Sequence, residues 1–418
     1  MPLSITLLRH ARSEANDANV WSGQGDAPLS EAGRAQARLV AERLRQRSFD
    51  LVVSSDLQRA RDTVTASGHA IETDSRLREI DLGEWEGRSF DDVAKDHPDL
   101  LAAIRAGEAV RPGVSGESMQ EFEERAWDAV LSIARDVGEG SVLISTHGGF
   151  IDAVVGRLIG RTGRRTYPIA TNSSLTEIRL SSIGDEEPRF RLQTFNDATH
   201  LGWDHGFLGR MRSEGKPVIG MVRHGVTVAN RERRIQGQTC WGLAPEGFDQ
   251  AAALAAHYGH VDEVWASPIR RATETAGAFA APAIRFDDDL KEMSFGTWEG
   301  LLYDDLIASS DPDVRRVFHD LEDLPRGGAE RFVDVSARMR AFLERSASGT
   351  GRRVVAVSHG AAIKSLLADI HGRGNDINLD VSVSRNTGVS HFVVTDQGPW
   401  LADWSVAPHL EDAAVHSA

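Results

Sequence analysis

The sequence contains two copies of one domain-length pattern, and this repeat constrains the fold more than any other feature. The motif "LLRHARSEAN" (7–16) recurs as "MVRHGVTVAN" (221–230). Further pairs are "VVSSDLQRARDTV" (52–64) with "VWASPIRRATETA" (264–276), "LREIDLGEWEG" (77–87) with "LKEMSFGTWEG" (290–300), "VLISTHGGFI" (142–151) with "VVAVSHGAAI" (354–363), "NSSLTEI" (172–178) with "NTGVSHF" (386–392), and "FRLQTFNDATHL" (190–201) with "WLADWSVAPHL" (400–410). Paired positions lie 209 to 214 residues apart, which indicates a duplicated whole domain rather than a solenoid of short units.

The repeat divides the 418 residues into a first domain, 1–202, and a second domain, 217–418. Between them lies "WDHGFLGRMRSEGK" (203–216), which we interpret as a linker because it combines glycine with charge. It also carries apolar residues, among them Trp203, Leu208 and Met211, so the sequence leaves open whether it packs between the domains or is a free linker.

Each half alternates short β-rich runs with helical patterns. The runs are "SITLL", "LVVSS" and "SVLIST" in the first half and "PVIGMV", "EVWAS" and "RVVAVS" in the second. Residues 31–46 show helical spacing of apolar side chains after a plausible N-cap at Ser30, and Pro245 with Glu246 opens the matching helix. "SMQEFEERAWDAVLSIARDV" and "FVDVSARMRAFLERSA" are further amphipathic helices. We therefore predict an α/β protein of two tandem three-layer α/β/α domains, each a largely parallel sheet with helices on both faces.

Charge and cysteine content narrow the possible partners. A formal net charge of −15 argues against a nucleic-acid or anionic-membrane surface as the main partner. Cys240 is the only cysteine, so neither an internal disulfide nor a thiolate zinc site is expected. The N-terminal apolar run is too short for a signal peptide, and no run of 18 apolar residues occurs. These features predict a cytoplasmic protein.

Histidines follow two of the expected strands in each half. His10 and His147 come directly after apolar runs in the first half, and His224 and His359 do so in the second. Sites in open α/β sheets form beyond the carboxyl ends of the strands. Each pair of histidines is therefore expected to converge on one site.

Each half repeats a set of two histidines, two arginines, a glutamate and an asparagine. The sets are Arg9, His10, Asn16, Arg59, Glu79 and His147 in the first half, and Arg223, His224, Asn230, Arg271, Glu292 and His359 in the second. Guanidinium groups bind phosphate oxygens bidentately, a neutral imidazole is a nucleophile near neutral pH, and a carboxylic acid can protonate a departing alkoxide. The sets predict phosphoryl transfer through a phosphohistidine, without a metal or other cofactor.

Both halves resemble the histidine phosphatase superfamily, also called phosphoglycerate mutase-like. Its Arg-His-Gly signature matches "RHG" at 223–225 fully and "RHA" at 9–11 with one change, and the resemblance covers nearly the whole chain twice. The resemblance implies that His10 and His224 are the phosphorylated nucleophiles, and that Glu79 and Glu292 are the proton donors. It implies phosphate-binding roles for the remaining residues, which are Arg9, Asn16, Arg59, His147, Arg223, Asn230, Arg271 and His359.

These observations predict a metal-independent phosphatase that hydrolyses phosphomonoesters of small metabolites at two active sites. Two alternatives stay open: a phosphoglycerate mutase-type phosphotransferase, and one half that is inert and serves as a binding or scaffold module. Mutases of this family usually carry an extra segment near the glutamate, whereas only 20 residues separate Arg59 from Glu79 and 21 separate Arg271 from Glu292. The sequence does not indicate the substrate, the pathway or the oligomeric state.

The halves differ at three places beside the repeated residues. Ala11 stands where the second half has Gly225, which leaves less backbone freedom beside the first nucleophile. "SGQGDAPLSEAG" (22–33) becomes the longer "IQGQTCWGLAPEG" (235–247), and Arg331 stands where the first half has Ser118. An added guanidinium favours substrates with a second anionic group. The two sites are therefore predicted to differ in specificity, with the second preferring the more anionic substrates.

Overall fold

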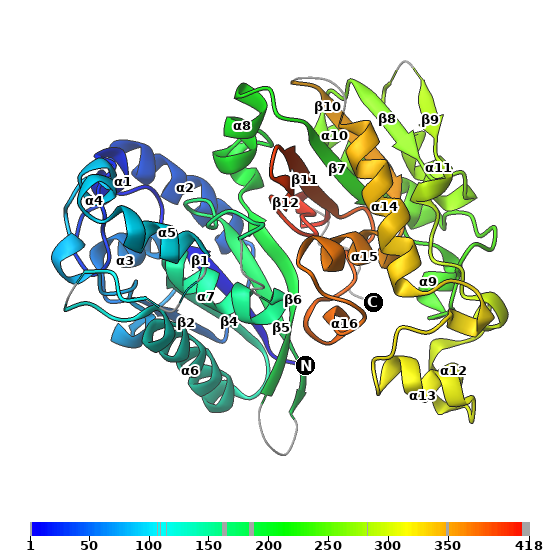
Figure 1. Cartoon of the computed structure of the whole chain (residues 1–418), viewed down its shortest axis with the longest axis horizontal. Coiled ribbons are helices and arrows are strands. Elements are labelled where there is room, and N and C mark those ends of the chain that lie inside the picture. Colours follow the sequence, from blue (N-terminus) through cyan, green and yellow to red (C-terminus); the bar gives the residue numbers. More distant parts are fainter. Residues whose placement is uncertain are drawn as a thin grey trace. The chain divides into compact units, whose positions relative to one another are not determined.

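The chain divides into two compact units, Met1–Gly206 and Phe207–Ala418, each built around its own sheet. The computed structural model describes residues 2–106, 108, 110–113, 115–160, 165–183, 188–281, 283–347 and 351–411 (Figure 1).

The first unit contains a mixed sheet of six strands in the order β3-β2-β4-β1-β5-β6 within the described residues. The strands are β1 (Ser4–Arg9), β2 (Leu51–Ser54), β3 (Glu72–Thr73), β4 (Ser141–Thr146), β5 (Leu175–Ile183) and β6 (Pro188–Asp197). Strands β1 to β4 pair in parallel, whereas β5 and β6 form an antiparallel extension beside β1.

The second unit repeats this topology strand for strand, in the order β12-β11-β7-β10-β8-β9. Its strands are β7 (Val218–Arg223), β8 (Glu263–Ala266), β9 (Ile284–Phe286), β10 (Arg353–Ser358), β11 (Val389–Thr395) and β12 (Gly398–Leu401). Again the first four are parallel and the last two are antiparallel. The predicted fold class is therefore confirmed: the structure holds two mostly parallel α/β sheets.

Helices lie on both faces of each sheet (Figure 1). In the first unit they are α1 (Glu14–Asp17), α2 (Glu31–Arg45), α3 (Gln58–Thr65), α4 (Phe90–Asp96), α5 (Pro98–Ala106), α6 (Met119–Val137) and α7 (Gly148–Ile159). In the second unit they are α8 (Gly206–Ser213), α9 (Val228–Arg231), α10 (Pro245–Tyr258), α11 (Arg270–Ala276), α12 (Tyr303–Ala308), α13 (Pro312–Phe318), α14 (Phe332–Ser346), α15 (Gly360–Ile370) and α16 (Ile377–Asp380).

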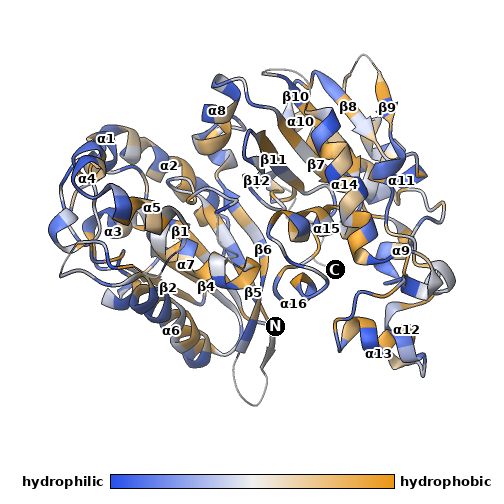
Figure 2. Ribbon diagram, viewed as in Figure 1, coloured by the Kyte–Doolittle hydropathy of each residue, from blue (hydrophilic) through white to orange (hydrophobic). Residues whose placement is uncertain are grey.

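The core forms where apolar sides of helices meet apolar strands. On one face of the first sheet, α2 contributes Val40 and Leu44, which pack in one cluster with Leu8 of β1 and Leu143 of β4. Figure 2 shows polar and apolar residues alternating along α14 of the second unit, the pattern expected of a helix with one face on a sheet. Burial of these apolar faces is the main force that fixes each helix against its sheet.

The predicted helix over 31–46 is present as α2, and its predicted cap is formed. The Ser30 hydroxyl accepts a hydrogen bond from the Gly33 amide over 3.2 Å, which satisfies one of the free amides of the first turn. In the matching helix α10, Pro245 occupies the first turn and Ala244 provides no side-chain cap.

The sheet register places the strand-end histidines side by side. Arg9 of β1 pairs with Thr146 of β4, so the next residues along the two strands are His10 and His147. The second unit has the same register between Arg223 and Ser358. Because β1 and β4 are parallel neighbours, the histidines emerge at the same edge of the sheet, as the sequence predicts.

The predicted linker 203–216 contains helix α8. Leu208 and Met211 of this helix pack with Val218, Val393 and Ala402 of the second unit. Of the apolar residues noted in the sequence, Leu208 and Met211 thus belong to a packed helix, and Trp203 is buried ahead of it. The division between the two units falls between Gly206 and Phe207. Within the described ranges, the chain offers no helix with the length and apolar character needed to cross a membrane.

Candidate active site

Each unit brings its six predicted residues together at the carboxyl edge of its parallel strands. We call them the first cluster (Arg9, His10, Asn16, Arg59, Glu79 and His147) and the second cluster (Arg223, His224, Asn230, Arg271, Glu292 and His359). The ring centroids of the two histidines are 5.2 Å apart in both clusters, at interplanar angles of 58° and 59°. The two copies of the repeat thus build nearly the same geometry.

A backbone carbonyl fixes the tautomer of each expected nucleophile. Nδ1 of His10 lies 2.7 Å from the carbonyl oxygen of Ala11, and Nδ1 of His224 lies 2.7 Å from that of Gly225. A carbonyl only accepts hydrogen bonds, so Nδ1 must carry the proton. In the second cluster the Arg271 Nε–H donates to His224 Nε2 over 3.1 Å. The lone pair of each neutral imidazole therefore lies on Nε2.

Burial and positive neighbours keep these imidazoles neutral. Burial, with the Arg59 and Arg9 guanidinium groups as further causes, lowers the pKa of His10 well below its usual value. The pKa of His224 is lowered in the same way by burial and then by Arg271 and Arg223. Each neutral imidazole thus carries its Nε2 lone pair in surroundings that attract a phosphate dianion, although in the second cluster this lone pair accepts a hydrogen bond from Arg271.

The second histidine of each cluster has one ring nitrogen engaged and one available. Nε2 of His147 lies 2.9 Å from the Ser55 hydroxyl, and Nε2 of His359 lies 2.8 Å from that of Ser267. The Nδ1 atoms of both rings are buried and have no hydrogen-bond partner within the described residues. An orphaned buried ring nitrogen requires a partner, and a phosphoryl oxygen fits this need.

Two arginines border each nucleophile, and carbonyl oxygens hold them. The Arg59 guanidinium donates to the carbonyls of Gly23 and Gly25, both over 2.6 Å. Arg9 donates from Nη1 to the Ala170 carbonyl and leaves its buried Nε without a partner among the described residues. Burial lowers the pKa of Arg9 to about 10, so the group stays charged at neutral pH.

The second cluster holds its arginines through the same kinds of contact. Arg271 donates to the carbonyls of Gly237 and Thr239 over 2.7 and 3.0 Å. Arg223 donates to the Ser384 carbonyl over 2.6 Å, and its buried Nε also has no partner within the part of the chain that the structure describes.

The carboxyl group of each expected proton donor lies at the first amides of the helix that follows the second histidine, α7 in the first unit and α15 in the second. Glu79 accepts hydrogen bonds from the amides of Gly149 and Ile80, over 2.8 and 3.0 Å. Burial is the largest cause that raises the pKa of Glu79 above its usual value. Glu292 accepts from the amides of Ala361 and Ala362, over 3.2 and 2.9 Å. The raised pKa of Glu79 lets its carboxyl group hold a proton for a leaving group.

Asn16 joins the first cluster through a second asparagine that sequence reasoning did not single out. Asn172 donates from Nδ2 both to the His10 carbonyl (3.1 Å) and to Asn16 Oδ1 (3.2 Å). In the second unit Asn386 donates in the same way to the His224 carbonyl (2.9 Å) and to Asn230 Oδ1 (3.4 Å).

Other residues that were not predicted bind the main chain directly after each nucleophile. Thr63 accepts from the Ala11 amide over 2.8 Å, and Thr275 accepts from the Gly225 amide over 3.0 Å. The partners of the second histidines, Ser55 and Ser267, were also missed. All of them lie inside the repeated motifs, so their recurrence in both halves was the available signal.

The structure gives a different physical reason for two of the differences between the halves, Ala11 against Gly225 and Ser118 against Arg331. Gly225 does not adopt a positive φ; a Cβ there would lie 2.5 Å from the Gly247 carbonyl oxygen, so close packing and not backbone freedom requires glycine. Arg331 is the N-cap residue of α14 and forms a two-point ion pair with Asp334 of the first turn, at 3.0 and 2.7 Å. Its charge is thus paired on its own helix, which does not support a role for Arg331 as an added charge for substrate.

The repeated tryptophans Trp85 and Trp298 are both buried, which places them in the core. Within the described residues, no group of three or more His, Cys, Asp or Glu side chains is arranged to hold a metal ion.

Comparison with known proteins agrees with this geometry in both halves. The family model of the histidine phosphatase superfamily (branch 1) matches residues 5–197 and again 219–407. The chain is 35% identical over 184 residues to "Putative phosphoserine phosphatase 2" of Hydrogenobacter thermophilus, covering 42% of this chain and 89% of that protein. It is 32% identical to "Probable phosphoglycerate mutase GpmB" of Photorhabdus laumondii, covering 48% and 95%.

A third relative is the glucosyl-3-phosphoglycerate phosphatase of Mycolicibacterium vanbaalenii, which is 36% identical over 220 residues, covering 48% of this chain and 97% of that protein. Each relative therefore corresponds in length to one of the two units. The chain belongs to the histidine phosphatase superfamily, branch 1, in two tandem copies, and it is a phosphoric monoester hydrolase.

Proposed function

We propose that both clusters hydrolyse phosphomonoesters of small metabolites through a phosphohistidine, without a metal. The observation that carries this proposal is the tautomer of His10 and His224. In each, Nδ1 is 2.7 Å from the next carbonyl, which leaves the lone pair on an Nε2 that two arginines surround. Arginine and imidazole donors stabilise the negative charge of a phosphoryl group in transfer, so no cation is needed there.

In the first step, Nε2 of the nucleophilic histidine attacks phosphorus and the ester P–O bond breaks. Arg9, Arg59, His147 and Asn16 bind the phosphoryl oxygens in the first cluster, and their counterparts do so in the second. The carboxyl group of Glu79 or Glu292 gives its proton to the departing alkoxide.

In the second step, a water molecule attacks phosphorus and the P–N bond breaks. The same glutamate, now a carboxylate, takes a proton from the water, and inorganic phosphate leaves. The histidine returns to its neutral form with the proton on Nδ1.

The substrate class is inferred from the relatives and from the charge of the chain. Two relatives carry names that specify phosphoserine and glucosyl-3-phosphoglycerate as substrates, which supports a small phosphorylated metabolite. A net charge of −15 disfavours nucleic acid and anionic membranes as partners. We also propose a cytoplasmic location, because the single cysteine, Cys240, is exposed and cannot form an internal disulfide of the kind that oxidising compartments favour.

The relative named as a phosphoglycerate mutase keeps phosphotransfer as a second candidate. In that reaction the phosphohistidine passes its phosphoryl group to a second hydroxyl rather than to water. The short spacing between Arg59 and Glu79, and between Arg271 and Glu292, favours hydrolysis over transfer.

The proposal is tested by phosphate release from p-nitrophenyl phosphate, with His10→Ala, His224→Ala and the double variant, all in the presence of EDTA. We expect each single variant to retain the activity of the other site and the double variant to fall to background. Vanadate should inhibit the wild type, because its trigonal-bipyramidal adduct resembles the transition state. An active double variant, or activity lost to EDTA and restored by magnesium, would contradict the proposal. Interconversion of phosphoglycerates without release of phosphate would support the mutase instead.

A further inference from the structure

We propose that Arg338 with Glu330, and Arg125 with Glu117, are positioning residues that hold the acid-bearing segment of each unit in place for proton transfer. We call each pair a brace. This inference rests on the proposed role of Glu292 and Glu79 as proton donors. It adds residues that do not touch the phosphoryl group and that act through the glutamate.

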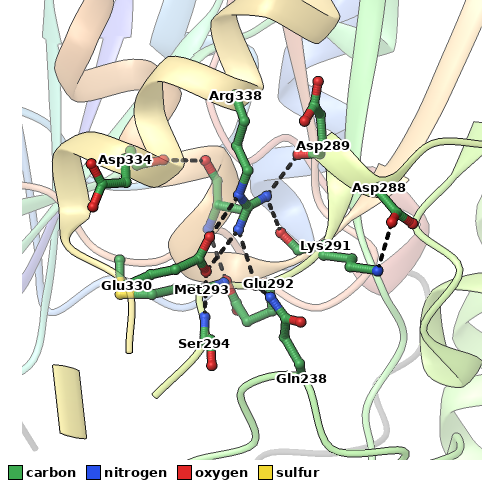
Figure 3. Close-up of polar contacts among 12 residues, drawn as sticks. Gln238, Asp288, Asp289, Lys291, Glu292, Met293, Ser294, Glu330, Asp334 and Arg338 are labelled. Carbon is green, nitrogen blue, oxygen red and sulfur yellow. Dashed lines mark hydrogen bonds and ion pairs between the residues drawn. The ribbon is translucent and has the colours of Figure 1, made fainter. Parts of the chain in front are cut away.

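In the second unit the Arg338 guanidinium binds the main chain around Glu292 (Figure 3). Its Nη1 donates to the carbonyls of Asp289 and Lys291, over 2.7 and 2.6 Å, and its Nη2 donates to the carbonyl of Glu292 itself over 3.0 Å. One side chain thus fixes three carbonyl oxygens within four residues, the last of which belongs to the acid.

Glu330 completes the brace from the other side of the acid. It accepts from Arg338 at Nε and Nη2, over 3.1 and 3.2 Å, and from the amide of Ser294 over 2.6 Å. The Glu330 amide in turn donates to the Ser294 carbonyl over 3.3 Å. The main chain is therefore held at Glu292 and again two residues later, as Figure 3 shows.

The first unit repeats the brace with the same connectivity. Arg125 donates to the carbonyls of Arg76, Arg78 and Glu79, over 2.7, 3.0 and 3.2 Å. Arg125 also binds Glu117 through Nε and Nη2, both over 2.7 Å. Glu117 accepts from the Asp81 amide over 3.0 Å. Two copies that differ at most positions retain this whole network.

The chemistry of the brace suits the positioning of the acid-bearing segment, beyond any contribution to the stability of the unit. Arginine presents five N–H donors in a rigid fork, so it can serve three carbonyls and a carboxylate together, which lysine cannot do. The segment around Glu292 has no regular secondary structure between a short 3-10 turn and the next. Two other side chains also hold this segment: Gln238 donates to the Glu292 carbonyl over 3.0 Å, and Ser358 donates to the Leu290 carbonyl over 2.8 Å. The brace supplies the charged contacts on both sides of the acid, and a shift of ~1 Å in the acid is enough to cost about 100-fold in rate.

The test exploits the fact that a proton donor matters only when the leaving group needs a proton. In the full chain with His10→Ala, so that only the second site acts, kcat/KM is measured on phenyl phosphate and on 2,4-dinitrophenyl phosphate. We expect Arg338→Ala to lower kcat/KM on phenyl phosphate by ~30- to 100-fold, mainly through kcat, since general acid catalysis contributes about 10²–10⁴-fold. On 2,4-dinitrophenyl phosphate, which departs as a stable anion, we expect less than a ~3-fold loss.

Arg340→Ala is the matched control. Arg340 lies on the same helix, has a partly buried side chain and forms ion pairs with Asp369 and Glu344 rather than with the Glu292 segment. It removes the same charge, and we expect both substrates to be turned over as before.

Glu292→Gln separates failure of this inference from failure of the proposed function. If Glu292→Gln does not slow phenyl phosphate selectively, then Glu292 is not the proton donor and the proposed function is wrong at this step. If Glu292→Gln is selective but Arg338→Ala slows both substrates equally, or neither, then the brace has no positioning role. If Arg338→Ala fails to fold, as judged by Tm, Arg338→Lys and Glu330→Gln replace it. We expect both to slow phenyl phosphate selectively, with a smaller loss of kcat/KM than Arg338→Ala would cause. An equal loss of kcat/KM on both substrates would overturn the inference.

Discussion

At the scale of single residues, the two proposed acids are seated differently although their surroundings repeat. A Cβ added at Gly149 would lie 2.2 Å from Glu79 Oε1, so the carboxyl group rests directly on the glycine backbone. The corresponding residue in the second unit is Ala361, whose amide donates to Glu292 over 3.2 Å, longer than the 2.8 Å bond of Gly149. The second unit therefore has room for a methyl group where the first has none.

Gly149→Ala should impair the first site through its acid. The new methyl group must displace Glu79, so we expect kcat/KM on phenyl phosphate to fall by about 10- to 100-fold in a His224→Ala background. The reverse change, Ala361→Gly in a His10→Ala background, should leave the rate within about twofold. Unchanged activity of Gly149→Ala would show that Glu79 tolerates displacement and is not used as the acid.

Most of the cluster was predictable from sequence at this scale, because arginine and histidine beside a strand end are costly unless chemistry requires them. Asn172 and Ser55 were not singled out, since asparagine and serine are common in turns for reasons of backbone geometry. Glu117 and Arg125 recur with the same spacing in both halves, but spacing alone does not reveal that Arg125 faces three carbonyl oxygens of another segment.

At the scale of elements, the parallel strands and long helices follow from periodicity, whereas the direction of the last two strands does not. The runs that precede His10 and His147 are apolar and β-branched, and they form β1 and β4 as predicted. Strand β5 pairs antiparallel with both β1 and β6, and β11 does so with β7 and β12, a direction that the period of side chains along a strand does not encode. The prediction of a largely parallel sheet is thus correct for four strands of six in each unit.

The cap of α2 gives a prediction at this scale. Ser30→Ala removes the acceptor of the Gly33 amide and should destabilise the start of α2 by about 1 kcal/mol. We expect amide hydrogen exchange in peptides from Glu31–Arg45 to become about fivefold faster, as mass spectrometry of the full chain would show. Peptides from α10 in the same sample are the internal control, because that helix has no side-chain cap to lose. Exchange that speeds up equally in both helices would contradict a local effect.

At the scale of the whole molecule, buried neutral histidines couple folding to pH, and four of them belong to the two clusters, with His200 and His371 acting in the same direction. Burial is the largest cause that lowers the pKa of His10, His147, His224 and His359 well below the usual value of 6.5. The unfolded chain therefore binds protons below about pH 6.5 that the folded chain does not bind. Stability must fall as the pH decreases through this region.

We expect Tm to decrease steadily from pH 7.5 to pH 5.5. In the double variant His10→Asn, His224→Asn, two of these imidazoles are replaced by groups that do not titrate, so the decrease should be smaller. The raised pKa of Glu79 acts in the opposite direction, because the folded chain takes up that proton first, but only as the pH approaches the carboxyl range. A Tm that is independent of pH in the wild type, or an equal slope in the double variant, would refute the coupling.

The duplication was also the feature that allowed the organisation of the whole molecule to be predicted from the sequence. It located two units and two sets of residues before any contact was known. The boundary was harder to predict, because the charged and glycine-containing stretch 203–216 looks like a linker although α8 within it packs on Val218. Local composition does not reveal which apolar residues of such a stretch pack against the rest of the unit.

The separation of the two clusters along the chain has a consequence for synthesis on the ribosome. The first cluster, its brace and the supporting Asn172 all lie between residues 9 and 172, and the first sheet is complete at Asp197. More than half of the 418 residues are then still to be translated. At about 5–20 residues per second, translation of the remainder of this sequence takes roughly 10–40 s, during which the first unit can fold. An active first site on a nascent chain is therefore the expected order of events, and a message truncated after the first repeat would still encode a complete unit.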